Sequence, residues 1–154
     1  MTREVLDGIR GLLETARVLS VAVVVDGEPE AGLLPYAPSE DFTALYVQAS
    51  GLARHTRGLH PGARVSILIH APDTPDQDPL QLRRLAVHAT VRLLERDTAP
   101  YPAAADRFIA RFPAAITTLA LDDFNLYELG LGRGRYVEGF GRAFNLGPET
   151  YAEL

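Results

Sequence analysis

The sequence of 154 residues contains no cysteine and no tryptophan, and its fifteen basic residues are all arginines, so lysine is absent as well. Without a lysine amine the chain cannot form the Schiff base on which covalent pyridoxal phosphate catalysis depends. Without cysteine it cannot form a disulfide, a thiolate nucleophile, a thiolate zinc site or a cysteine-held iron–sulfur cluster. His55 and His60 are five residues apart and do not form the H-E-x-x-H pattern, so we expect no metal site.

Positive charge and long apolar runs are also scarce. A net charge of -5 and a pI near 5.3 argue against binding to nucleic acid or to an anionic membrane, because both need basic surface. No apolar run approaches the roughly 18 residues of a membrane helix, and the first ten residues are too charged for a secretory signal. We therefore expect a soluble, cytoplasmic protein, with a single domain over residues 1–154.

The hydrophobic pattern predicts a mainly β protein with a few flanking helices. Apolar residues recur at helical spacing in an opening helix, with Thr2 as its cap, and again around residues 103–112. A short helix is expected over 52–59, between strands. Period-2 alternation and β-branched runs predict strands over 19–25, 31–37, 43–49, 64–70, 84–93, 124–129 and 135–140. Because these strands are short and are not interleaved with helices, an antiparallel barrel, closed or split, is the expected packing.

Proline and glycine mark the interruptions of this pattern. Asp26-Gly27 predicts a tight hairpin turn. Pro35 lies inside the second predicted strand and has no N–H to donate, so it belongs at a strand edge or where backbone is exposed to a ligand, and both interpretations remain open. The glycines of residues 130–134 and 139–141 superficially match a dinucleotide fingerprint, but the required strand and helix around them are absent. We interpret both glycine groups as turns between strands.

The stretch from Ala44 to Thr56 is the strongest candidate for a binding site. An apolar strand ends in Ser50-Gly51, and Arg54, His55 and Thr56 follow. A hydroxyl, two cationic side chains and the N–H groups of a helix start are the donors that a phosphate dianion prefers. The alternative is that these side chains are merely solvated on an exposed helix.

The sequence resembles the FMN-binding split-barrel superfamily, in the branch related to pyridoxamine 5'-phosphate oxidase and to the haem-utilisation (HugZ-like) proteins. The resemblance covers nearly the whole chain. Its most specific parts are A-S-G-L-A-R-H-T-R-G-L at residues 49–59, the following R-V-S-I-L-I strand, and Y-V-E-G-F-G-R-A at residues 136–143. What this resemblance implies is a six-stranded antiparallel split β-barrel that forms a homodimer, with one FMN at each of two equivalent sites in the subunit interface.

The resemblance also implies which residues would contact the cofactor. Ser50, Arg54, His55 and Thr56 would hold the FMN phosphate. Arg142 would contribute to the flavin site of the opposite subunit. Backbone from two neighbouring strands would line the flavin ring, at Leu34, Pro35, Tyr36, Val47, Gln48 and Ala49.

Departures from the family pattern limit the function. The arginine- and tryptophan-containing signature of true pyridoxamine phosphate oxidases is missing, and the sequence has no histidine after His88 that could reach haem iron from a C-terminal tail. His70 and His88 lie on polar strand faces, and Arg84 and Arg92 share the face of His88; we interpret all four as solvated.

The expectation is therefore an FMN-dependent oxidoreductase of unknown substrate, with no catalytic side chain assigned. One alternative is a flavin- or haem-binding carrier or sensor without turnover. A barrel-shaped interaction protein that has lost its cofactor is another.

Overall fold

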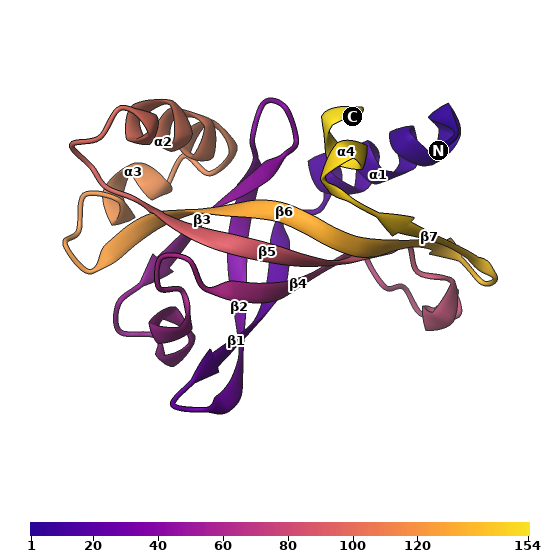
Figure 1. Cartoon of the computed structure of the whole chain (residues 1–154), viewed down its shortest axis with the longest axis horizontal. Helices are drawn as coiled ribbons and strands as arrows, with labels where there is room; N and C mark the ends of the chain where they lie inside the picture. Colours follow the sequence, from indigo (N-terminus) through magenta and orange to yellow (C-terminus); the bar gives the residue numbers. More distant parts are fainter.

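The computed structural model describes residues 1–154. Its strands form one antiparallel sheet that closes on itself. Its order is β3-β2-β1-β4-β5-β6-β7, and β3 also pairs with β6. That last pairing closes β1 to β6 into a six-stranded barrel and leaves β7 as an extra strand on β6 (Figure 1). The strands are β1 (Val18–Val25), β2 (Glu28–Pro38), β3 (Ala44–Ser50), β4 (Arg64–His70), β5 (Arg84–Leu94), β6 (Phe124–Gly139) and β7 (Arg142–Leu146).

Helices cover the two ends of the barrel. In Figure 1, α2 and α3 lie at one end, and α1 and α4 lie with both chain termini at the other. None of the helices is long and apolar enough to cross a membrane. The helices are α1 (Arg3–Thr15), α2 (Pro100–Arg111), α3 (Ala115–Thr118) and α4 (Pro148–Ala152), with 3-10 turns η1 (Arg54–Gly58) and η2 (Pro79–Gln81).

β1, β4 and β5 have one buried and one exposed face, as the alternating pattern predicts, whereas β3 is largely buried on both faces. Exposure alternates residue by residue along β1, and along β5 from Leu85 to Arg92. The inward side chains form one hydrophobic cluster with the buried face of α1, and a smaller cluster lies under α2 and α3. The predicted six-stranded antiparallel barrel is therefore confirmed, with β7 as one extra strand.

Several local predictions are also confirmed. Thr2 Oγ1 accepts from the Val5 N–H at 3.4 Å and caps α1. Asp26 and Gly27 both have positive φ, at 53° and 80°, as a tight hairpin turn requires. Pro35 is the last residue of β2 paired to β1, and Tyr36 begins the pairing to β3. Proline therefore lies where β2 changes partners and its missing N–H is tolerated.

The interpretation of residues 130–134 as a turn is wrong. This glycine-rich stretch is the middle of β6, a single strand of 16 residues. It is glycine-rich because β5 comes very close: a Cβ at Gly134 would lie 2.6 Å from the carbonyl oxygen of Ala86. The real hairpin lies at residues 139–142, where Gly141 has φ of 76°. The pattern also did not predict β7 and α4, which the C-terminal tail forms.

A pair of glycine substitutions tests this packing. Gly134→Ala should lower the free energy of unfolding by about 1–3 kcal/mol, because backbone atoms of β5 must move to admit the methyl group. Gly11→Ala is the matched control: no atom lies within 4 Å of the added Cβ, and the position is helical. It should raise stability by about 0.5–1 kcal/mol. Urea denaturation of both variants measures the difference, and equal midpoints would contradict the close β5–β6 contact.

Candidate functional site

Two polar residues of the predicted phosphate segment, Ser50 and Arg54, are already engaged within the chain. Ser50 Oγ donates to Asp123 Oδ2 at 3.2 Å and accepts from the Leu52 N–H at 3.1 Å. The Arg54 guanidinium forms an ion pair with Glu30 on β2. Two carboxylates therefore face the groups that were expected to bind a phosphate dianion, and both carboxylates would repel it.

His55 and Thr56 in η1 point toward the barrel rather than into solvent. The His55 ring packs on Gly32 so closely that a Cβ there would lie 2.6 Å from the ring. His55 Nε2 and Thr56 Oγ1 are both buried and have no hydrogen-bond partner. The His55 ring thus packs η1 on the β1–β2 hairpin, and Thr56 is buried beside it in the chain.

The residues predicted to line a flavin ring are adjacent in space, because Tyr36 pairs with Val47 across β2 and β3. Their side chains are largely covered, however. The Tyr36 hydroxyl donates to the Leu13 carbonyl at 2.9 Å, and Gln48 Nε2 donates to Thr118 Oγ1 at 2.6 Å. Burial raises the pKa of the Tyr36 phenol well above its ordinary value, so this hydroxyl stays protonated. Leu34, Val47 and Ala49 are buried and Pro35 is half-buried.

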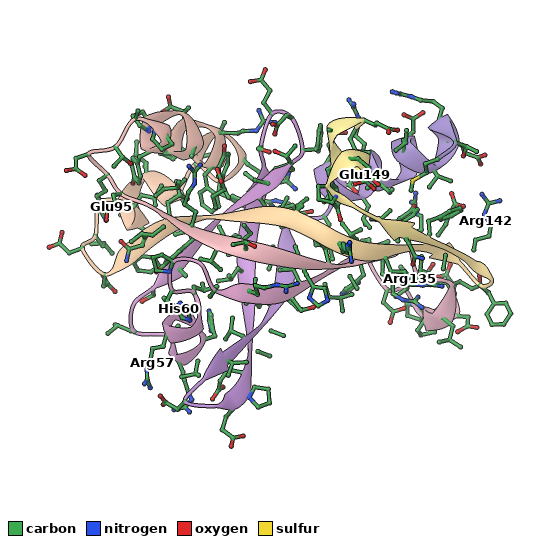
Figure 2. The ribbon with its side chains drawn as sticks, in the orientation of Figure 1. Arg57, His60, Glu95, Arg135, Arg142 and Glu149 are labelled. Atoms are coloured by element: carbon green, nitrogen blue, oxygen red, sulfur yellow. The ribbon has the colours of Figure 1, made fainter.

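Arg142 lies far from these residues within one chain. It forms an ion pair with Glu138 at 2.6 Å on the β6–β7 hairpin. Figure 2 shows it at the opposite end of the molecule from Arg57 of η1. A contribution of Arg142 to the predicted segment therefore requires a second chain, and the cofactor role of all the predicted residues stays a prediction.

A second cluster of functional side chains lies on the outer face of β4, β5 and β6. Between the pairs Val87–Gly134 and Ala89–Leu131, β5 has the single residue His88 and β6 has two, Gly132 and Arg133. The extra residue is a β-bulge, and it turns the exposed Arg133 toward the depressions that His88 also lines. Bulges often redirect a side chain beside a functional site in this way.

Three open depressions meet at this bulge, and Arg133 lines all of them. Their volumes are about 410, 520 and 470 Å³. His88 lines two, with Ser66 and Arg135 in one and Arg64 in the other. A histidine and three arginines from β4, β5 and β6 thus surround one region of the sheet surface.

The cations of this cluster are not neutralised by the chain itself. Arg64 and Arg133 form no ion pair, and Arg135 donates only to the neutral Asn145 Oδ1 at 3.0 Å. By contrast, Arg92, further along β5, is paired with Glu128 at 2.7 Å. In a chain of net charge -5, this surface is suited to an anionic ligand.

From the sequence, His88 was considered and interpreted as solvated, whereas no binding role was expected for the arginines around it. Arg133 was missed because residues 130–134 were interpreted as a turn, and Arg135 was placed at the start of the following strand without a role. A signal was present: the inward residues of β6 are Leu129 and Leu131 and then Tyr136, so the alternation changes phase between positions 131 and 136. Such a phase change predicts a bulge.

Comparison with known proteins gives the following picture. No family model matches the chain. HutZ of Vibrio cholerae, named a haem oxygenase, is 28% identical over 148 residues, which cover 95% of this chain and 83% of HutZ. The crystal structure of HutZ, described there as a haem storage protein, has a TM-score of 0.73 at 24% identity and covers 90% and 92% of the two chains.

A haem-binding protein from Mycobacterium smegmatis is similar in structure as well. Its TM-score is 0.84 at 27% identity, and the match covers 99% of this chain but 62% of that protein. This chain therefore spans less than two thirds of the mycobacterial protein. A Clostridium acetobutylicum protein of the pyridoxinephosphate oxidase family shares the fold alone, with a TM-score of 0.70 at 12% identity.

These comparisons correct the predicted cofactor. FMN was wrong, because the relatives similar over nearly the whole chain are named for haem. The carboxylates beside Ser50 and Arg54 are consistent with this correction, since they oppose a phosphate dianion.

The donor groups of the chain fit haem. With no cysteine, the four histidines provide the imidazoles that could serve as axial ligand to haem iron. The two haem propionates are carboxylates, for which arginine is the preferred partner. His88 and the unpaired Arg64 and Arg133 offer both kinds of group on one face, and no cluster of His, Asp and Glu competes for a free metal ion.

Proposed function

We propose that this protein binds haem and carries or stores it. The observation that supports this most strongly is the similarity, over 95% of the chain or more, to HutZ and to the mycobacterial haem-binding protein. The outer sheet face adds support, because it combines an exposed imidazole with arginines free to pair with propionates.

In this function the residues of the chain bind and orient the ligand. An imidazole would hold the iron and arginines would fix the propionate edge, and the rigid barrel strands would keep these groups at constant separation. Haem, when bound, supplies the redox and oxygen chemistry. The proposal requires no proton transfer by a side chain, and we assign none.

Haem degradation is the second candidate, because HutZ is named a haem oxygenase as well as a storage protein. The two functions differ in what happens to haem after reduction in air. A carrier retains it, whereas an oxygenase opens the porphyrin ring.

Titration of the purified protein with ferric haem tests the proposal. We expect a saturable Soret band of the bound form, with one haem per chain, and no quenching of FMN fluorescence when FMN is added instead. Ascorbate in air should then leave the Soret band in place. Absence of any Soret change on titration would refute haem binding, and loss of the band with release of carbon monoxide would establish degradation in place of storage.

We also propose that two copies of the chain associate through the outer face of β1, β2 and β4. Across the sheet, Leu33 pairs with Ser20, Ser20 with Leu68, and Leu68 with Ala86, so one row of the outer face carries no charge. Leu33 is 66% exposed in the single chain. A second copy would cover this row and would also bring Arg142 within reach of the predicted η1 segment of its partner.

Replacement of Leu33 tests the association. Leu33→Asp should convert a dimer into a monomer, because it places a carboxylate in the apolar row. Ile116→Asp is the control, since Ile116 is 65% exposed on α3, away from this row. Light scattering after size exclusion gives the mass of each variant. A wild-type protein that runs as a monomer, or a Leu33→Asp variant that remains dimeric, would contradict the proposed interface.

A further inference from the structure

The β6 bulge brings together groups that a regular ladder would keep apart. In an unbroken antiparallel pair one residue of β6 would face His88, and the residue after it would point to the other side of the sheet. Here two residues of β6, Gly132 and Arg133, lie opposite His88, and Arg133 is exposed on the same face of the sheet as His88. The glycine beside it allows a close approach of the strands, because a Cβ at Gly132 would lie 3.1 Å from the His88 carbonyl oxygen and would press on β5.

The surroundings of His88 are flat because its neighbours are small. Ser66 is its partner on β4, Ala86 and Thr90 precede and follow it on the same face of β5, and Gly132 and Gly134 lie across on β6. None of these side chains is long enough to reach the height of the imidazole. A ligand can therefore approach a ring nitrogen of His88 over these small residues, with Arg64, Arg133 and Pro148 lining the same depression.

His88 is also the histidine best placed to bind a ligand. His55 is packed on Gly32 and its Nε2 is buried. His60 lies in a loop after η1, with its Nδ1 3.4 Å from the Pro61 carbonyl. His70 is at the end of β4, and its Nδ1 is 2.7 Å from the Ala71 carbonyl, which leaves Nε2 free. His88 forms no hydrogen bond and lies among cations, so His70 is the competitor to be tested.

The arginines on either side of His88 are matched to two carboxylates. Arg64 and His88 line one depression, and Arg133 lines it as well. Neither arginine is paired within the chain, so both can form the charge-assisted hydrogen bonds that arginine makes to carboxylates. The Arg135 guanidinium already donates a hydrogen bond to Asn145 and is less free to bind a carboxylate.

Resting on the proposed haem-binding function, we infer that His88 is the axial ligand to haem iron, and that Arg64 and Arg133 bind the haem propionates. The bulge at Gly132-Arg133 is what assembles this site. It lies on the outer sheet face and is separate from the η1 segment that the sequence pattern favoured.

Histidine variants test the ligand assignment, with spectroscopy as the readout. His88→Ala should abolish the imidazole-ligated signature of ferric haem in electron paramagnetic resonance and shift the Soret band, and free imidazole should restore both. His60→Ala and His70→Ala should leave the wild-type spectrum unchanged. Because His88 is exposed, the variant should keep the wild-type urea midpoint, which shows that the loss is not one of folding.

The outcomes distinguish haem binding itself from the identity of the residue that binds the iron. If the wild type does not bind haem, the proposed function fails. If the wild type binds haem and His88→Ala keeps its spectrum and affinity, the function stands and the site assignment is overturned; a loss in His70→Ala would then identify the competing ligand.

Esterified haem tests the arginines. Arg64→Ala and Arg133→Ala should each weaken haem binding by about tenfold, the effect of losing one charge-assisted hydrogen bond. The same variants should bind haem dimethyl ester as the wild type does, because the ester has no carboxylate to lose. Arg57→Ala is the control, since Arg57 is an exposed arginine paired with Asp26. An equal loss of affinity for haem and for its ester would overturn the propionate assignment.

Discussion

The pairing of β6 with three different strands is the constraint on which the rest of the structure depends. β6 closes the barrel on β3, runs along nearly the whole of β5, and carries β7 on its second half. On its second edge β6 pairs with β3 over residues 124–130 and with β7 over residues 134–139, so Gly132 and Arg133 lie where that edge has no partner strand. The extra residue opposite His88 is accommodated there as a bulge, and the bulge determines which side chains reach the outer face.

Barrel closure also divides the chemistry of the protein between two surfaces. The inner face is filled with aliphatic side chains and holds no space for a ligand, so binding has to occur on the outer face or between chains. On the outer face, an uncharged row across β2, β1 and β4 continues into the histidine and arginines of β5 and β6. The unpaired cations beyond the end of this row are the groups that a dicarboxylate ligand such as haem requires.

The fold was predictable from sequence and the site only in part. The alternating hydrophobic pattern specified the strands, Thr2 marked the start of α1, Asp26-Gly27 the β1–β2 turn and Pro35 the point where β2 changes partners, because each of these signals acts over a few residues. The long β6 was divided in two because glycine is common both in turns and where backbones approach closely, and only the position of β5 decides between them. The surroundings of the predicted phosphate segment were hidden for a similar reason: Glu30 and Asp123, which engage Arg54 and Ser50, lie 24 and 73 residues away from them in sequence. The cofactor role of that segment stays a prediction. The correction from FMN to haem likewise came from similar proteins rather than from any sequence motif.

The most direct test of the account is the position of iron in crystals of the haem-loaded protein, from an anomalous difference map at the iron absorption edge. The account predicts one iron peak per chain within coordination distance of the His88 imidazole, with Arg64 and Arg133 contacting the propionates. An iron peak at η1 or beside His70, with the β6 bulge free of ligand, would contradict it.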